Sequence, residues 1–373
     1  MIRLFIISSL VTFKVATAHA DCQEIRLDLP GGSLANVPVM DQDGSGLCYT
    51  YSGSQMIDAY RFSHGDTQTS HLTSPFISAL RYKAEDVSSP GYKGDSVNLM
   101  IDAGQIDELV SSVAQHGSCS RTVLSSDWVD SSHIDHTEIS EISSQVDRLR
   151  ESLLSGQTPD SDRLYTLACA LQQDFFVDLK SDLQSLTEVV SKIPEGLVKK
   201  GFPLADQNGL YVLDKLLSKK CESDSVKLPA DLKVSMVKCK NYTDVKDVLS
   251  SYKKMVSENL TNNTSQPIGL TYNPAFLTSK RQARRSCLSK SRLSRFSDGT
   301  ANPADGQIQC NDVGHASLIV GQRQNKKGVC QLLIRNSFGV SCNPYTAWDC
   351  ENGQIWVDED VVLRNTESLS TIK

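Results

Sequence analysis

The chain lacks several features that would place it in other classes of protein. No internal apolar run reaches about 18 residues, so we expect no membrane insertion. Lys and Arg number 38 against 44 Asp and Glu, and this lack of basic excess argues against nucleic acid as a partner. No C-x-x-C pair occurs, and His133-x-x-His136 is an isolated pair in a polar stretch, so no metal or other cofactor is expected. Hydrophobic residues make up 39% and charged residues 22% of the 373 residues, which is typical of a globular protein of about two domains.

The first 20 residues have the pattern of a secretory signal. Arg3 is followed by a short apolar segment from Leu4 to Phe13, and Ala18-His19-Ala20 is a small-x-small cleavage site. The alternatives are a buried first strand or an anchor helix, but ten apolar residues are too few to cross a bilayer. We therefore predict a signal peptide over residues 1–20 and a secreted or periplasmic protein that begins at Asp21.

The sequence contains eleven cysteines, all of which follow Ala20. In an oxidising compartment most thiols pair, and an odd number leaves at least one unpaired. The other ten could form up to five disulfides, whose connectivity the sequence does not define. Cys342 and Cys350 are the best local candidates for a pair, because a turn containing Asn343-Pro344-Tyr345 separates them.

Cys48 has the most unusual surroundings of the eleven cysteines. It follows the segment Asp41-Gln42-Asp43-Gly44-Ser45-Gly46-Leu47, a glycine-containing turn that leads into a pattern of apolar residues at helical spacing. Cys48 would then lie in the first turn of a helix, where unpaired backbone N–H groups and the helix dipole stabilise a thiolate. A buried or disulfide-bonded cysteine is the alternative.

Two further segments each place one polar residue at the end of a predicted strand. His315 begins an apolar run that ends at Gly321, and Asn336 follows the run that begins at Gln331. Taken alone, such residues are usually a structural histidine and a turn asparagine. A base next to a nucleophile, held in one tautomer by a third group, would instead need this set of side chains.

Together these three segments resemble those of papain-like cysteine peptidases, in which they read D-Q-x-x-x-C-G-S-C-W-A-F-S, H-A-V-x-I-V-G-Y and W-x-I-K-N-S-W-G. The resemblance implies that Cys48 is the nucleophile, that His315 is the general base and acid, and that Asn336 orients its ring. It also implies that Gln42 donates a side-chain N–H to the oxyanion, beside the backbone N–H of Cys48. The fold implied is α+β and two-lobed, with a helical lobe, a β-barrel-like lobe and a cleft between them.

The spacing of the motifs predicts an insertion. His315 lies 267 residues after Cys48, whereas the family spacing is about 130–150 residues. We predict a helical lobe over residues 21–130, a helical insertion over 131–243 and a β-rich lobe over 244–373. Apolar residues at helical spacing predict helices within 139–153, 164–179 and 183–193. The insertion would either pack against the rest of the chain or act as a lid that restricts the cleft.

A fourth segment also resembles the family, and several residues differ from the family's motifs. Ala103-Gly104 resembles the glycine pair that lines the family's substrate groove, so these two residues are candidates for substrate binding. Tyr49 and Phe338 stand where the family has tryptophans, and the second of these tryptophans shields the His–Asn hydrogen bond. No departure removes a reacting atom.

We therefore expect an exported, papain-like cysteine endopeptidase that acts through a thioester on protein or peptide substrates, as a monomer. Two alternatives remain open. One is a non-catalytic peptide-binding homologue. The other is a different Cys–His acyl-transfer enzyme, such as a transglutaminase or a cell-wall peptide amidase.

Overall fold

The structure is a computed structural model of the chain. It describes residues 22–42, 46–66, 68–88, 104–123, 136–155, 183–193, 211–216, 218, 221, 224–261, 265–278, 289–290, 308–309 and 314–373. The predicted signal segment, Ala103 and the helix predicted within 164–179 lie outside these residues. In the described part the fold is α+β, with an antiparallel sheet and several helices, as the sequence predicted.

The main sheet is antiparallel throughout and has the strand order β10-β11-β9-β8-β5-β12-β4, with β1 paired to β8. Its central strands are apolar and buried, because helices or loops cover both faces. The register of β8 with β9 shifts between Ile319 and Gly321. A Cβ at Gly321 would lie 2.4 Å from the carbonyl oxygen of Ile25, so this glycine lets β1 approach. The strands are β1 (Ile25–Arg26), β4 (Val234–Lys238), β5 (Ile268–Tyr272), β8 (His315–Gln324), β9 (Cys330–Arg335), β10 (Asp349–Glu351), β11 (Gln354–Asp358) and β12 (Thr366–Ile372).

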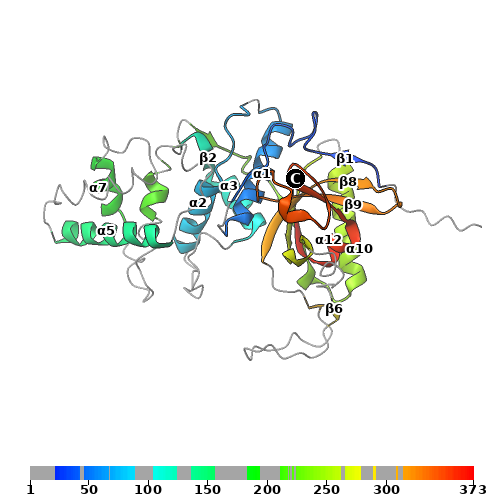
Figure 1. Cartoon of the computed structure of the whole chain (residues 1–373). Helices are drawn as coiled ribbons and strands as arrows, with labels where there is room; N and C mark the ends of the chain where they lie inside the picture. The colour runs from blue at the N-terminus through cyan, green and yellow to red at the C-terminus, as the bar shows by residue number, and fades with distance from the viewer. Residues whose placement is uncertain are drawn as a thin grey trace, which may run out of the picture.

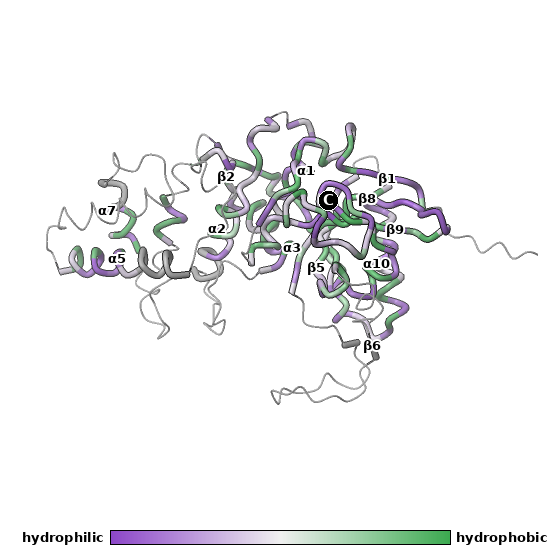
Figure 2. The backbone as a smooth tube through the Cα atoms, viewed as in Figure 1, coloured by the Kyte–Doolittle hydropathy of each residue, from purple (hydrophilic) through white to green (hydrophobic). Residues whose placement is uncertain are grey.

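Helices α1 (Cys48–Ser63), α3 (Ile106–His116), α10 (Val245–Thr261) and α12 (Glu359–Arg364) pack against this sheet, and α2 (Pro75–Ser88) packs on α1 and α3 (Figure 1). Helices α1, α2 and α3 form one group, while α10 and α12 lie against the strands. Figure 2 shows hydrophobic residues concentrated where α1 and α3 meet the central strands. No helix among the described residues combines the length and apolar character needed to cross a membrane.

Helices α5 (His136–Leu154) and α7 (Leu183–Ser191) occur where the periodicity predicted them. They pack on each other through buried Val146, Leu149 and Val190, and Figure 1 places them on the side of α2 that faces away from the sheet. The range 131–243 is not wholly helical, however. It contains β4, which pairs with β12 in the main sheet, and β3 (Ser225–Val226), which pairs with β2 (Ser118–Cys119). Lysines flank the short Val-Ser-Met-Val core of β4, and helical periodicity therefore did not predict this strand.

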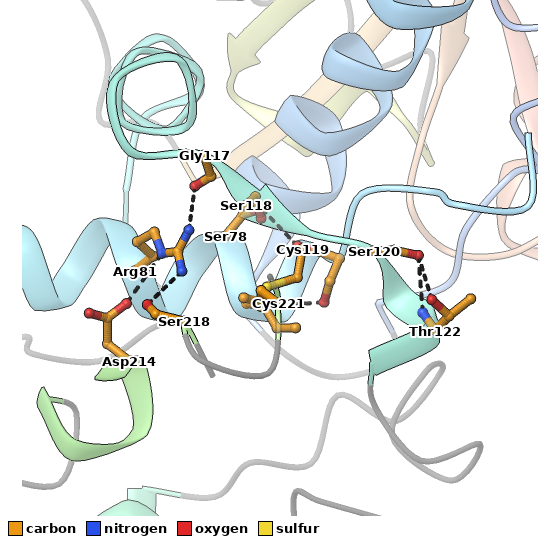
Figure 3. Close-up of a disulfide and its surroundings, with 12 residues drawn as sticks. Ser78, Arg81, Gly117, Ser118, Cys119, Ser120, Thr122, Asp214, Ser218 and Cys221 are labelled. Atoms are coloured by element: carbon orange, nitrogen blue, oxygen red, sulfur yellow. Dashed lines mark hydrogen bonds and ion pairs between the residues drawn. A yellow bond between two sulfur atoms is a disulfide. The ribbon is translucent and has the colours of Figure 1, made fainter. Parts of the chain in front are cut away.

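A disulfide and a buried arginine attach residues 211–221 to the helical group (Figure 3). Cys221 is bonded to Cys119 in β2, 102 residues earlier in the chain. From α2, Arg81 contacts Asp214 at 3.3 Å and donates to Ser218 Oγ at 2.7 Å. The same guanidinium donates to the carbonyl oxygen of Gly117 at 2.9 Å. This joint therefore combines a covalent bond with a satisfied buried charge.

The disulfides leave one thiol unpaired among the described cysteines, that of Cys48. The predicted pair Cys342–Cys350 is confirmed, and Cys22 is bonded to Cys330. Cys239 is also disulfide-bonded. Cys169, Cys287 and Cys310 lie outside the described residues.

A fully buried carboxylate fixes the second half of α1. Asp58 accepts hydrogen bonds from the backbone N and Oγ1 of Thr73, at 3.0 and 2.6 Å, and from Arg61 at 3.0 Å. Burial raises the pKa of Asp58 to about 6, against the hydrogen bonds from Thr73, which lower it. The chain before α2 is thereby tied to the helix that begins at Cys48.

We expect Asp58→Ala to lower the free energy of unfolding by about 3–5 kcal/mol, because it leaves the backbone N–H and hydroxyl of Thr73 buried without their acceptor and removes the buried ionic partner of Arg61. Urea denaturation followed by circular dichroism measures this loss. Asp66→Ala is the matched control: Asp66 binds the same arginine but is more exposed, so its loss should cost about 1 kcal/mol or less. Equal losses for the two variants would contradict the assignment.

Candidate active site

The thiol of Cys48 lies at the N-terminus of α1, which begins at that residue. The side chain is half-buried, its Sγ lies 4.0 Å from the carbonyl oxygen of Gly46, and the nearby backbone N–H groups of Ala316 and Tyr49 lower its pKa. Burial outweighs them, so the pKa of the Cys48 thiol is raised. The contact with Ala316 places the sulfur beside the residue that follows His315.

His315 is the first residue of β8 and is buried. Its Nε2 lies 2.6 Å from Asn336 Oδ1, and because that oxygen can only accept, Nε2 carries the proton and Nδ1 is left as the acceptor. The ring stacks on Phe338 and meets the edge of Tyr272, with centroids 5.1 and 5.6 Å apart. Burial lowers the pKa of His315, and the hydrogen bond to Asn336 opposes that shift.

Asn336 follows the last residue of β9, and both ends of its side-chain amide form hydrogen bonds. Its Oδ1 accepts from His315, from Ser317 Oγ at 3.1 Å and from the backbone N of Ser337 at 2.9 Å. Its Nδ2 donates to the hydroxyl of Tyr345 at 2.9 Å. The backbone N–H of Ser337 is a donor only, so it fixes which end of the amide faces the imidazole.

The structure also brings Gln42 to this group. The backbone N of Gln42 donates to the carbonyl oxygen of Ser337 at 2.7 Å, and the Ser337 hydroxyl donates to Gln42 Oε1. The amide oxygen of Gln42 is therefore turned towards Ser337, and its NH₂ group points the other way. This is the orientation that an amide donor to a reacting group requires.

Gly104 lies against the residue that follows the thiol. A Cβ at Gly104 would come within 2.4 Å of the Tyr49 ring, which is buried and meets Tyr82 of α2 edge-on at 6.1 Å. Only a residue without a side chain allows this approach. The other predicted groove residue, Ala103, lies outside the described residues.

Three polar residues at the site were not predicted from the sequence: Tyr272, Ser317 and Tyr345. Tyr272 ends β5, pairs with His315 and hydrogen bonds Ser317 at 3.0 Å. A signal for Ser317 existed, because two residues along a strand return to the same face as His315. Tyr345 lies in a separate loop, and nothing local in the sequence indicated its position.

This arrangement supplies a nucleophile, a base and an orienting amide, which is the set needed for nucleophilic acyl transfer. No group of three His, Cys, Asp or Glu side chains in the described part of the chain is arranged to hold a metal ion.

We expect Gly104→Ala to lower the free energy of unfolding by about 1–3 kcal/mol, because the new methyl group must displace the buried ring of Tyr49. Thermal or urea denaturation measures the loss. Gly314→Ala is the control next to the same site: a Cβ there meets only Pro274 Cδ at 3.9 Å, so its effect should stay within about 0.5 kcal/mol. Equal tolerance of both substitutions would refute the close approach.

No protein-family model and no curated protein match the chain. Solved structures do match it. PepW of Lactobacillus rhamnosis is 12% identical, over 93% of this chain and 81% of that one, with a TM-score of 0.43. The bromelain protease of Ananas comosus is 12% identical, over 94% and 99%, with a TM-score of 0.39. The Amb a 11 cysteine protease of ragweed, in its proform, is 11% identical, over 96% and 66%, with a TM-score of 0.40.

The structures matched are papain-like cysteine proteases, the family whose motifs the sequence resembles.

Proposed function

We propose that the chain is an exported, papain-like cysteine endopeptidase with Cys48, His315, Asn336 and Gln42 as its catalytic residues. One observation carries this proposal: a free thiol at a helix N-terminus lies beside Ala316, the residue after a histidine whose ring an asparagine holds through a 2.6 Å hydrogen bond. A cysteine and a histidine with purely structural roles would not need a free thiol and a ring held by an asparagine. The three disulfides between described cysteines agree with an oxidising compartment and therefore with export.

In the first half of the reaction, the Cys48 sulfur forms a bond to the carbonyl carbon of a peptide while its proton passes to His315 Nδ1. The oxyanion that forms accepts hydrogen bonds from Gln42 Nε2 and from the backbone N–H of Cys48. His315 then gives its proton to the leaving nitrogen, and the C–N bond breaks to leave a thioester. In the second half, the oxygen of a water molecule bonds to the carbon while the water gives a proton to His315. The C–S bond then breaks, and His315 returns that proton to the Cys48 sulfur.

The protonation states of Cys48 and His315 must change together. Burial raises the pKa of Cys48 and lowers that of His315, so each group taken alone favours its uncharged form. Proton transfer from the thiol to the imidazole creates adjacent opposite charges and leaves the net charge of the site unchanged. Asn336 favours this transfer because its Oδ1 stabilises the protonated imidazole.

The proposal predicts that an epoxide inhibitor of the E64 type alkylates the purified protein at Cys48 alone, as located by peptide mass spectrometry. Cys48→Ala should abolish labelling, and His315→Ala should slow it about 10²–10⁴-fold, because the general base is lost. Products from casein separate the alternatives. Hydrolysed peptides support a peptidase, cross-linked products would indicate a transglutaminase, and labelling without turnover would indicate a non-catalytic homologue.

A second prediction concerns pH. The acid limb of kcat/KM should lie below pH 6.5, the ordinary pKa of histidine, because burial lowers the pKa of His315 and only its neutral form accepts the thiol proton. Asn336 raises that pKa, so Asn336→Ala should move the limb to still lower pH while reducing the rate. Steady-state kinetics on a fluorogenic peptide measure both effects. A limb above pH 6.5, or a shift to higher pH in the variant, would exclude His315 as this base.

A further inference from the structure

The loop between Cys342 and Cys350 reaches the proposed active site through one side chain. The disulfide closes the loop over a sequence separation of eight residues, and the turn η4 (Asn343–Tyr345) lies inside it. Backbone hydrogen bonds from Tyr345 N to Cys342 O and from Trp348 N to Tyr345 O, at 3.0 and 3.1 Å, hold the turn. Tyr345 is 2% exposed, and its hydroxyl accepts the Nδ2–H of Asn336 at 2.9 Å.

The nitrogen end of the Asn336 amide needs this acceptor. Asn336 is 1% exposed, so a buried N–H without a partner would cost free energy, and the amide would rotate about its side-chain bond to recover one. That rotation would also move Oδ1, which is the atom that holds His315 Nε2. Tyr345 therefore fixes the end of the amide opposite the histidine.

The hydroxyl of Tyr345 is suited to this role at any ordinary pH. Burial and the negative charge of Asp41 raise the pKa of Tyr345, while the hydrogen bond from Asn336 lowers it, and the net shift is upward. The phenol therefore stays protonated and accepts the amide N–H through its lone pairs.

The side chains that shield the His315–Asn336 hydrogen bond explain why support from Tyr345 matters in this chain. Phe338 stacks on the imidazole but is 36% exposed and has only a benzene ring. Tyr272 covers another edge of the same ring and reaches Asn336 through Ser317. With Tyr345 on the nitrogen side, buried hydroxyls approach the orienting amide from both ends.

We propose that Tyr345 is a positioning residue for the reaction and that the Cys342–Cys350 disulfide keeps it in place. This inference rests on the proposed peptidase function. Tyr345 does not reach the reacting atoms; it acts through Asn336 on the position of the His315 ring.

The test compares Tyr345→Phe with Tyr252→Phe. Tyr252 is equally buried, and its hydroxyl donates to the carbonyl oxygen of Glu367 at 2.6 Å, so this control loses a buried hydroxyl on α10. Tyr345→Phe should lower kcat about ten-fold with KM unchanged, since an unpaired buried N–H is worth about one factor of ten. Tyr252→Phe should lower the Tm and leave kcat as it is. A similar fall in kcat for both variants, or for neither, would overturn the proposal.

The role of the disulfide is tested by replacing Cys342 and Cys350 with serine. This double variant should lose kcat to a similar degree, and adding Tyr345→Phe to it should cause no further loss, because both changes release the same amide. Losses that multiply would show that the disulfide acts elsewhere.

An NMR measurement, which does not depend on activity, distinguishes the positioning role of Tyr345 from the proposed peptidase function. In protein labelled with ¹⁵N-histidine, NMR reports the tautomer of His315, whose proton lies on Nε2 in the wild type. Tyr345→Phe should alter that signal and Tyr252→Phe should not. A wild type without turnover whose His315 signal still responds to Tyr345→Phe would refute the peptidase function and retain the positioning role. An unaltered His315 signal in Tyr345→Phe would overturn the positioning role itself.

Discussion

The hydrogen bond between His315 and Asn336 depends on the antiparallel pairing of β8 with β9. One residue begins its strand and the other follows the end of its partner, so antiparallel pairing brings both to the same end of the sheet. In the register that pairs Leu318 with Arg335, Asn336 comes opposite Ser317, two residues along β8 from His315 and on the same face of the strand. The N-terminus of α1 meets that same end of the sheet through the contact of Cys48 with Ala316. A slip of one residue between β8 and β9 would turn His315 to the other face.

The segment before α1 is hydrogen-bonded to the same end of the sheet. Arg335 Nη2 donates to the carbonyl oxygen of Val37 at 2.6 Å, Gly339 N donates to Met40 O at 3.1 Å, and Gln42 N donates to Ser337 O. These bonds run side by side from residue 335 to residue 339 and hold the chain that leads into Cys48. The proposed nucleophile, oxyanion donor and orienting amide are therefore all positioned by the end of β9 and the residues just after it.

Strong local patterns predicted much of this structure. Apolar runs bounded by polar residues gave β8 and β9, helical spacing gave α1, α5 and α7, and a short separation gave the Cys342–Cys350 disulfide. The candidate residues came from motif resemblance and remain proposals. Tyr272 and Tyr345 could not be predicted, because their positions depend on which strand β5 joins and on how a closed loop folds back. The Cys119–Cys221 bond joins residues 102 positions apart, a distance over which sequence carries no pairing signal.

Within the predicted insertion, β4 joins the main sheet, Asp214 and Cys221 are attached to α2 and β2, and α5 and α7 extend away from the sheet (Figure 1). Among the described residues, packing connects this part of the chain to the site: Arg81 contacts Asp214, the next residue, Tyr82, meets the Tyr49 ring, and Tyr49 follows Cys48. Such a route transmits a change only where it has two arrangements. The structure holds a single arrangement, with the Tyr49 ring buried and close to Gly104. The joint therefore acts as a fixed support for the helix that carries the thiol.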